Sequence, residues 1–599
     1  MNRKITLPGS HRRRQACPHC EKEQMMLCLY KTFFMRFLWF ATENAGIINL
    51  YQTAAAAGPP GRKRSIMTNY GEEYLFSRQA SSQITGYYHA WYQLHEIELE
   101  AALAKKDHSE SGALSCGVVR YSHLKNYILS GEPRPDIIIA CDDDGYLTDC
   151  ARTMISDYFA ENPDINLLYA DEDRVTSKGE YVDPWLKSDW APDTFLSTFY
   201  FGNIFAIRSI ALSVVNPGAR RAQDIESMST IKADSIEEQL ARRDEPDESL
   251  RSWIYGKLCM KLAQADGGFS IRRKGRFPIG HIPEVLFHAT EKFQAWDSDL
   301  IKGSLTGRYD ADSAATRLIS IILPSKDNPE VLRRCVKSVE KHTRIPFELI
   351  IVDNGSNHAN RQKVQELVDE INENNSAIYV YREMEFNMSA FYNLGASYAN
   401  GGLLLFLHDD VVVQRHEWLS HLSEKAKLPY VGAVGMKLLY PSSNIIQHAG
   451  IMSVQGTPVY KLQYRRNAET QYFGFNKGIR NVLAVTGACM MVRKELFDKV
   501  GGFDEERYPH CYSDIDFCYR IHEQGFYNVV RNNMYLFYHE ASAPVEEVRR
   551  QRELQRDSEL EILRAAHPEL SARDPFYHKY LTQNIKEARF ILDAGSLTI

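Results

Sequence analysis

The sequence has no apolar run long enough to cross a bilayer. Its most apolar segment, Met25–Ala41, contains Lys31 and Arg36 and falls short of the roughly 20 clean apolar residues that a spanning helix needs. The segment also lies far from the start and has no cleavage-site pattern, so it is not typical of a secretory signal peptide. We therefore expect no membrane span. An amphipathic helix on a membrane surface and a packed surface helix both stay open for this segment.

A disulfide framework is also missing. The eleven cysteines are odd in number and scattered along the chain, which favours reduced thiols in the cytoplasm. Cys17 and Cys20 form a lone CxxC pair with no strand before it and no second ligand pair after it, so neither a redox centre nor a zinc site is predicted.

An overall excess of basic residues is absent too. The net charge of −6 gives no footprint for nucleic-acid binding, and no nucleic-acid partner is expected. Residues 1–66 contain eleven Lys and Arg against three Asp and Glu, a local charge of +8, which leaves −14 for the rest of the chain. Such a basic segment can contact a membrane surface peripherally, or it can simply be solvated.

The 599 residues are too many for one core and predict three to four units. Residues 54–64 form a linker of small residues, Pro-Pro and a basic cluster. Residues 216–250 are charged and poor in apolar side chains, as in a long loop, and 293–315 form a connector. The predicted units are 1–66 (basic segment), 67–135 (helical), 136–300 (α/β), 316–545 (α/β) and 546–599 (helical tail).

From Leu318 onwards, apolar runs alternate with segments of helical spacing. Such runs suit strands buried on both faces of a parallel sheet, and their alternation with helices indicates βαβ units. Predicted strands cover 318–323, 347–352, 378–381, 403–407 and 527–538, and predicted helices cover 331–342, 362–371, 389–399 and 517–524. The sequence therefore predicts an α/β fold whose ligands lie beyond the carboxyl ends of the strands.

Polar clusters follow two of these strands. Asp353, Asn354 and Gly355 come after 347–352; a short acid there can accept from a base or ribose group, although the tetrapeptide is also a good loop former. Asp409 and Asp410 come after 403–407. Adjacent carboxylates are costly unless a cation or a network offsets them, so a Mg²⁺ or Mn²⁺ site is predicted beside the alternative of solvated turn acids.

A third cluster, Asp514 and Asp516, precedes the helix at 517–524. Acids in a first helical turn are often only capping groups, a reading that fits Asp516 better than Asp514. An ionised carboxylate at 514 suits a general base that takes a proton as a hydroxyl attacks. His539 follows the strand at 527–538 and could complete a metal site, or it could be structural.

These clusters belong to a longer series of motifs that resembles a known family. In this order and spacing they resemble the family 2 glycosyltransferases, inverting enzymes with the GT-A fold, over a little over a third of the chain. Residues 574–581 also resemble the end of tandem, rhamnosyltransferase-like members that act in surface polysaccharide synthesis. The matching stretches are 319–325, 347–356, 387–395, 405–411, Gly450, 485–493, 501–505, 514–520 and 539–540.

The resemblance implies a role for each matching position. Asp514 would be the catalytic base, and Asp410 and His539 would bind the metal. His408 stands where the family has its first acid, so Asp410 is the safest metal ligand and Asp409 would contact ribose or metal. The nucleotide-sugar pocket would be lined by Pro324, Asp353, Asn354, Asp409, Gly487 and Ala488.

The block at 136–300 resembles the same family less completely. Residues 168–174, 183–190 and 281–288 match the latter part of such a domain. Residues 71–135 contain nothing like a strand leading into Asp-Asn-Gly-Ser, and the region comparable to Asp514 reads Trp253-Ile-Tyr-Gly. We expect a truncated, degenerate transferase-like domain, with Asp142 and Asp144 left as open metal candidates.

Together these features predict a metal-dependent, inverting glycosyltransferase in cell-surface polysaccharide synthesis. The donor would be a UDP-, dTDP- or GDP-linked sugar, and the acceptor a saccharide or lipid-linked saccharide at the inner face of the membrane. Two alternatives are a non-catalytic glycan-binding scaffold and a nucleotidyltransferase. The intact acids argue against the first, and the second should have a Gly-rich basic loop that residues 324–329 lack.

Overall fold

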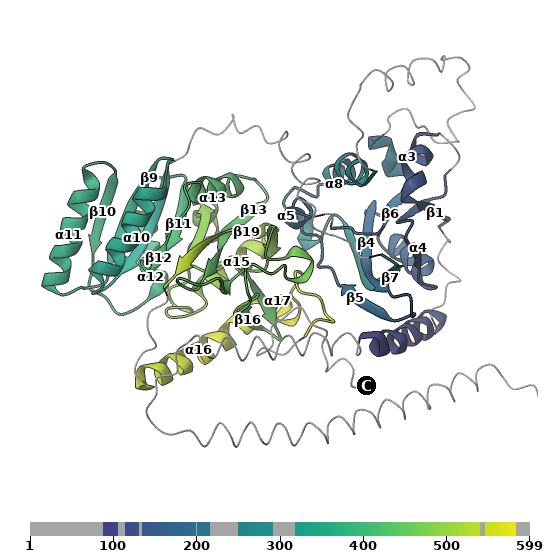
Figure 1. Cartoon of the computed structure of the whole chain (residues 1–599). Helices are drawn as coiled ribbons and strands as arrows, with labels where there is room; N and C mark the ends of the chain where they lie inside the picture. The colour runs from purple at the N-terminus through teal and green to yellow at the C-terminus, as the bar shows by residue number, and fades with distance from the viewer. Residues whose placement is uncertain are drawn as a thin grey trace, which may run out of the picture. The chain divides into compact units, whose positions relative to one another are not determined.

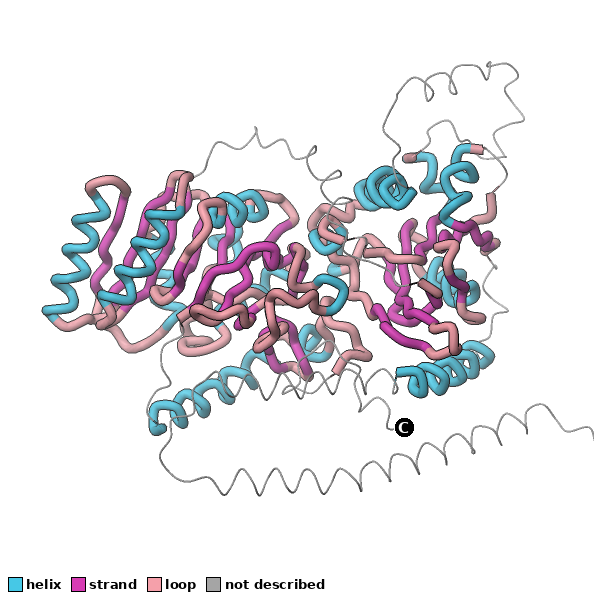
Figure 2. The backbone as a smooth tube through the Cα atoms, viewed as in Figure 1, coloured by secondary structure: helices cyan, strands magenta, loops and turns pink. Residues whose placement is uncertain are grey.

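Two large β-sheets and the helices around them dominate the part of the chain that the computed structural model describes (Figures 1 and 2). The described residues are 88–105, 114–130, 134–198, 200–215, 250–291, 318–539 and 546–582. The predicted basic segment at 1–66, the linker at 54–64, nearly all of the loop at 216–250 and nearly all of the connector at 293–315 lie outside them. Within these ranges, no helix is both long and apolar enough to traverse a bilayer.

The second sheet contains ten strands, and its first half confirms the parallel α/β prediction. The order is β10-β9-β8-β11-β18-β13-β19-β12, with β14 on β13 and β17 on β19. Strands β10, β9, β8 and β11 run parallel, whereas β18 runs antiparallel to β11. The strands are β8 (Ile319–Ser325), β9 (Phe347–Asp353), β10 (Ser376–Tyr381), β11 (Leu403–Leu407), β12 (Val411–Val412), β13 (Val431–Leu439), β14 (Ile446–His448), β17 (Ile479–Val482), β18 (Cys489–Arg493) and β19 (Tyr527–Tyr538). A separate hairpin pairs β15 (Ile451–Val454) with β16 (Thr457–Tyr460).

Helices of this block follow the predicted pattern. Asn387 caps α12, because its side chain accepts a hydrogen bond from the N–H of Ala390. Helix α15 begins four residues before the predicted start, directly after Tyr512 in a left-handed conformation (φ 56°), so Asp514 lies in its first turn. Figure 1 shows α10 and α11 beside β9 and β10. The helices are α10 (Pro329–His342), α11 (His358–Asn372), α12 (Met388–Ser397), α13 (Trp418–Ala426), α14 (Lys494–Val500) and α15 (Ser513–Glu523).

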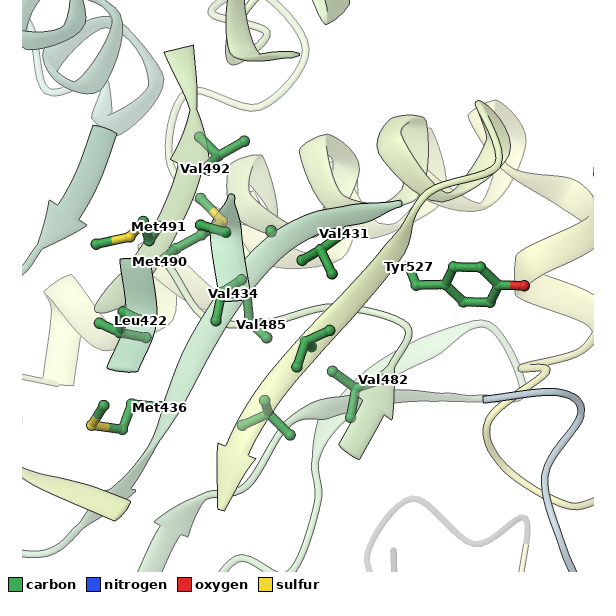
Figure 3. Packing of buried hydrophobic residues seen from close by; sticks show 14 of the residues in the cluster. Leu422, Val431, Val434, Met436, Val482, Val485, Met490, Met491, Val492 and Tyr527 are labelled. Carbon is green, nitrogen blue, oxygen red and sulfur yellow. The ribbon is translucent and has the colours of Figure 1, made fainter. Parts of the chain in front are cut away.

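The core beside the antiparallel strands is tightly packed (Figure 3). Val434 on β13 lies opposite Met491 on β18, and both side chains are fully buried. Gly435 is their neighbour, and a Cβ there would lie 2.8 Å from Cβ of Val485. Each fully buried apolar side chain of this kind contributes about 1.5–3 kcal/mol. The core therefore fixes the strand ends that carry the polar clusters.

The first sheet has the order β1-β2-β6-β4-β7-β3, with β5 paired to β4. Strand β1 lies within the stretch predicted as helical, so the sequence did not predict it. It pairs in parallel with β2. The strands are β1 (Cys116–Arg120), β2 (Ile137–Cys141), β3 (Gly145–Leu147), β4 (Leu167–Val175), β5 (Tyr181–Trp185), β6 (Ile204–Arg208) and β7 (Gly280–Ala289). Its helices are α3 (Tyr121–Leu129), α4 (Ala151–Glu161), α5 (Pro192–Phe195), α7 (Leu250–Trp253), a π-helical turn (Ile254–Cys259) and α8 (Met260–Ala265).

The two sheets share one strand order. Taken from one neighbouring strand to the next, the first sheet's order β1-β2-β6-β4-β7-β3 corresponds to β8-β11-β18-β13-β19-β12 in the second sheet. The directions agree as well: β1–β2 and β8–β11 are parallel, β4–β7 and β13–β19 are parallel, and the other three pairs in each set are antiparallel. Among the described residues, the first sheet has no counterpart of β9 and β10.

The C-terminal segment contacts the first sheet's block and the β15–β16 hairpin, where Asp574 accepts a 2.9 Å hydrogen bond from the N–H of Ser453. Helix α16 (Glu546–Ala566) and helix α17 (Pro568–Ala572) lead into residues 573–582. Arg573 pairs with Asp189 over 2.7 Å, and His578 pairs with Asp171 over 2.8 Å. Helix α5 also contacts the second block, since its fully buried Asp193 accepts hydrogen bonds from Lys425 on α13 (2.7 Å) and from the side chain of Asn481 on β17 (3.1 Å).

Candidate active site

The ends of β8, β9 and β11 bring two predicted clusters together. Ser325 lies opposite Asp353 in the sheet register, and Pro324 lies opposite Val352. The hydroxyl of Ser325 donates to Oδ2 of Asp409 over 2.8 Å. The residues predicted for the nucleotide pocket thus lie beside the predicted metal motif. Ser325 was not among the predicted site residues, although its place next to Pro324 at a strand end was a usable signal.

Asp353 and Asn354 are buried and already hydrogen-bonded. Asp353 is 1% exposed; its Oδ1 accepts from the N–H of Ser356 (2.8 Å), and its Oδ2 accepts from the hydroxyl of Tyr379 (2.5 Å). Asn354 Oδ1 accepts from the N–H of Met384 over 3.1 Å. These bonds hold the turn after β9 in one shape. Tyr379, on β10, is a further residue that the sequence did not reveal.

His408 packs toward β19. Its Nδ1 lies 3.0 Å from the hydroxyl of Tyr538, and burial lowers its pKa to about 4, so the ring is neutral at pH 7. The backbone N–H of His408 donates to the carbonyl of Ala488 over 3.2 Å. Asp409 is partly buried, and this burial raises the pKa of its carboxyl group. The first position of the motif is therefore held by strand contacts.

Asp410 and His539, the two predicted metal ligands, are neighbours in the structure. Val411 pairs with Tyr538 in the β12–β19 ladder, and the next bond runs from the N–H of His539 to the carbonyl of Asp410 over 3.0 Å. Burial, with the positive charge of Arg334, lowers the pKa of His539 and leaves its imidazole neutral. No cluster of three or more His, Cys, Asp or Glu side chains that could hold a metal occurs in the described ranges.

A carboxylate and a neutral imidazole on two residues joined by a backbone hydrogen bond fit a divalent cation that takes its other ligands from water and phosphate oxygens. Mg²⁺ binds in this way through one or two carboxylates plus substrate phosphates. Imidazole also suits first-row transition metals. The donor set of Asp410 and His539 thus matches a metal that is completed by a diphosphate.

Asp514 is held at the amino end of α15 by backbone donors. Its Oδ2 accepts from the N–H of Gly487 (2.7 Å), and its Oδ1 accepts from the N–H of Ile515 (2.9 Å). Burial raises its pKa, and these bonds oppose the rise. The carbonyl of Gly487 in turn accepts from the hydroxyl of Tyr392 over 3.1 Å.

Gly487 and Ala488 connect the predicted base to the predicted metal motif. Gly487 binds Asp514, while the next residue, Ala488, binds the backbone of His408. The three predicted clusters, including Asp514, therefore meet around the carboxyl ends of the sheet. Asp516 has a different environment: it is fully buried and pairs with Arg520 (2.8 Å) and His567 (3.1 Å), as expected of a structural acid.

Residues 320–501 match the family model described as Glycosyl transferase family 2. The chain carries a domain of this family. The α/β sheet with parallel strands β10, β9, β8 and β11 agrees with the GT-A fold that the resemblance implied. The matched range contains all of the nucleotide-pocket candidates and Asp410, whereas Asp514 and His539 lie after it.

The chain is also similar to a much longer protein. O-antigen biosynthesis protein RfbC of Myxococcus xanthus is 30% identical over 435 residues, which are 71% of this chain and 32% of that protein. The chain thus spans about a third of the length of RfbC. Two solved structures are more distant.

The mannosyltransferase PcManGT of Pyrobaculum calidifontis, in complex with GDP-Man and Mn²⁺, is 12% identical with a TM-score of 0.31, covering 41% of this chain and 63% of that chain. GalNAc-T7 with UDP, GalNAc and Mn²⁺ is 16% identical with a TM-score of 0.31, covering 42% of this chain and 51% of that chain.

The first sheet repeats two bonds of the glycosyltransferase domain. The hydroxyl of Ser122 donates to Asp143 over 2.6 Å, as Ser325 does to Asp409. The N–H of Thr290 donates to the carbonyl of Asp144 over 3.0 Å, as the N–H of His539 does to Asp410. Asp142, Asp143 and Asp144 therefore occupy the positions of the His408–Asp410 motif.

The chemistry-bearing groups differ between the two sheets. Thr290 stands where the glycosyltransferase domain has His539. Arg251 forms a 2.6 Å ion pair with Asp142, so a guanidinium lies beside the first acid of the 142–144 cluster. The helical segment Leu250–Ala265, which precedes β7 as α15 precedes β19, contains no Asp or Glu.

Proposed function

We propose that this chain is an inverting glycosyltransferase that uses Asp514 as its general base and takes its sugar from a nucleotide-diphosphate donor. The observation that carries the proposal is the position of Asp514. Its carboxylate is held by the N–H of Gly487, and Gly487–Ala488 connects it to the His408–Asp410 motif. The family match over 320–501 supports the reaction class.

In the proposed reaction, Asp514 takes the proton of an acceptor hydroxyl. The hydroxyl oxygen attacks the anomeric carbon of the donor sugar and forms the new glycosidic bond. The bond between that carbon and the diphosphate oxygen breaks, and its electron pair leaves with the nucleoside diphosphate. One displacement from the face opposite the leaving group inverts the anomeric centre. The raised pKa of Asp514 suits this role, because a stronger base accepts the proton more readily.

Asp410 and His539 are the residues that would hold Mg²⁺ or Mn²⁺. When bound, such an ion supplies positive charge to the departing diphosphate. Burial keeps His539 neutral, so its ring can act as a ligand at pH 7. Asp353, Asn354, Pro324 and Asp409 would bind and orient the nucleotide part of the donor.

The similarity to RfbC supports a role in polysaccharide synthesis. We propose a saccharide or lipid-linked saccharide as acceptor, a UDP-, dTDP- or GDP-sugar as donor, and a cytoplasmic location with peripheral contact at the membrane. The intact Asp514–Gly487 contact favours catalysis over a glycan-binding scaffold, because a scaffold needs no buried base.

The first sheet is proposed to have no transfer activity. Its helical segment before β7 has no acid to match Asp514, Thr290 replaces the histidine, and Arg251 neutralises Asp142. The described residues also contain no counterpart of β9, which ends in Asp353, or of β10, which carries Tyr379. This block would share its fold with the glycosyltransferase domain and would serve only to pack against that domain.

Asp514→Asn tests the proposal. A panel of UDP-, dTDP- and GDP-sugars with Mn²⁺, scored by thermal shift, first identifies the donor. The variant should bind that donor as wild type does but lose transfer by about 10²–10⁴-fold, the usual contribution of a general base. Asp144→Asn, in the first sheet, is the control and should transfer normally. Retained turnover in Asp514→Asn would remove Asp514 as the base.

A further inference from the structure

Phe386 is an exposed aromatic ring held in a fixed orientation. It is 47% exposed, although most large apolar side chains of this block are buried. Its ring is nearly parallel to that of His510, with an interplanar angle of 6° and a centroid distance of 6.0 Å. Buried Phe391 packs edge-on against it, with centroids 5.8 Å apart. The exposed face of Phe386 is thus presented to solvent on a rigid support.

The loop that carries Phe386 is attached to the turn after β9. The N–H of Arg382 donates to the carbonyl of Asp353 over 2.9 Å, and the N–H of Met384 donates to Oδ1 of Asn354 over 3.1 Å. Gly355 adopts a φ of 76°, and a Cβ there would meet Glu383 at 3.0–3.3 Å. Phe386 therefore lies on the loop next to the residues proposed to bind the nucleotide.

The loop that carries His510 leads directly to Asp514. It is joined to the first loop by two bonds, from the N–H of Met388 to the carbonyl of Pro509 (2.7 Å) and from the side chain of Asn387 to the carbonyl of Glu505 (2.9 Å). Four residues span at most about 14 Å, so the His510 backbone lies no farther than this from that of Asp514.

Helix α16 fixes His510 from behind. The carboxylate of Glu559, which is 5% exposed, accepts hydrogen bonds from the N–H groups of His510 (3.2 Å) and Cys511 (2.7 Å). Arg556, one turn earlier, donates to the hydroxyl of Tyr512 over 3.1 Å. The ring pair is therefore held in place before any ligand arrives, which reduces the entropy cost of binding.

We propose that Phe386 and His510 form an acceptor subsite that stacks against the apolar C–H face of a pyranose ring. The subsite rests on the proposed function, since it binds the part of the acceptor that does not react. Parallel aromatic faces offer apolar area with fixed geometry, as in ligand sites that are lined by aromatic side chains. Because His510 lies at most about 14 Å from Asp514 along the backbone, the subsite could hold a sugar next to the one whose hydroxyl is glycosylated.

The test compares Phe386→Ala with wild type on lipid-free disaccharides, using the disaccharide that wild type glycosylates fastest. Phe386→Ala should raise the acceptor KM about three- to tenfold, the range expected for one aromatic contact. The donor Kd should stay near the wild-type value, and Phe386→Tyr should restore the KM. Tyr398→Ala is the matched control, because Tyr398 is 46% exposed at the far end of α12; its kinetics should equal those of wild type.

An unchanged acceptor KM in Phe386→Ala would overturn the subsite. A rise in KM that appears only with lipid-linked acceptors would also overturn the subsite, and it would identify the Phe386 ring as a lipid contact. Calorimetric titration of the same disaccharides into the full chain with UDP gives a readout that does not depend on turnover. Suppose that the wild type binds the disaccharide but transfers no sugar, and that Phe386→Ala does not bind it. The proposed function then fails while the subsite stands.

Discussion

The backbone N–H of Gly487 donates a 2.7 Å hydrogen bond to Oδ2 of Asp514. This bond favours the ionised carboxylate, whereas burial favours the protonated form, and burial has the larger effect on the pKa. A Cβ at position 487 would lie 3.5 Å from that of Asp514, so an alanine fits there and keeps the donor.

The first prediction concerns the pH dependence of transfer. The base must be ionised to accept a proton, so kcat/KM should fall as the pH drops through the pKa of Asp514. Because burial raises this pKa, the acid limb should lie above the value of about 3.9 that is usual for aspartate. A pH–rate profile of the full chain checks this. A limb at the usual value would contradict the buried environment.

The second prediction concerns the metal. Chelation with EDTA should suppress transfer, and Mn²⁺ or Mg²⁺ should restore it. Asp410→Asn and His539→Ala should each reduce metal-activated transfer, Asp410→Asn by about 100-fold, since charge stabilisation by a metal is worth several kcal/mol. The matched controls are Asp144→Asn and Thr290→Ala, which alter the same positions of the first sheet. Full activity in EDTA would rule out a metal.

The third prediction concerns His567, which holds α17 against α15. Burial opposes its protonation, but hydrogen bonds to Asp516 and Glu523 raise its pKa to about 9. The unfolded value is about 6.5, so the stabilisation is complete below pH 6.5 and is lost as the pH rises through 9. The free energy of unfolding should therefore fall by up to about 3 kcal/mol over this window.

Denaturant titrations from pH 6 to 9.5 measure this slope. His567→Asn should flatten it, whereas His421→Asn, which removes an exposed pair with Glu424, should leave it intact. Equal slopes in wild type and His567→Asn would show that the ring does not change its protonation in this window.

The fourth prediction concerns the first sheet. Arg251→Met leaves the buried carboxylate of Asp142 without its cation and should cost about 1–2 kcal/mol of stability. This is less than for a wholly buried pair, because Arg251 is 39% exposed. Transfer should be unaffected. Arg174→Met removes an exposed pair with Asp183 and should cost less than about 1 kcal/mol. A large loss of transfer in Arg251→Met would give this sheet a catalytic role.

Much of the second sheet could be predicted because its strands are continuous apolar runs. The runs at 403–407 and 527–538 coincide with β11 and β19, and the acids that follow such runs lie at one edge of the sheet. The adjacency of Asp410 and His539 was also accessible, because both follow strands of the same sheet. These features depend on local pattern and on the general topology of α/β sheets.

Other features depend on contacts between distant residues and leave no local signal. Strand β1 is short and only half-buried, so its apolar run is weak. Glu559 resembles any acid of a charged helix, and only its bonds to residues 510 and 511 reveal its role. The partial resemblance at 168–174, 183–190 and 281–288 predicted a transferase-like first block, but no local signal revealed β1, which completes the strand order that the two sheets share.

The contacts of residues 573–580 with the first sheet imply an order of assembly. Arg573 and His578 come more than 380 residues after Asp189 and Asp171, the acids with which they pair. During synthesis, each sheet can collect its own strands as they emerge, since domains generally fold as units from the amino-terminal end. His281, on β7, already contacts Asp171 over 3.1 Å and Asp189 over 3.2 Å, so the first sheet can form before Arg573 and His578 are made. The later pairing of Arg573 and His578 would therefore join the C-terminal segment to a sheet that has already folded.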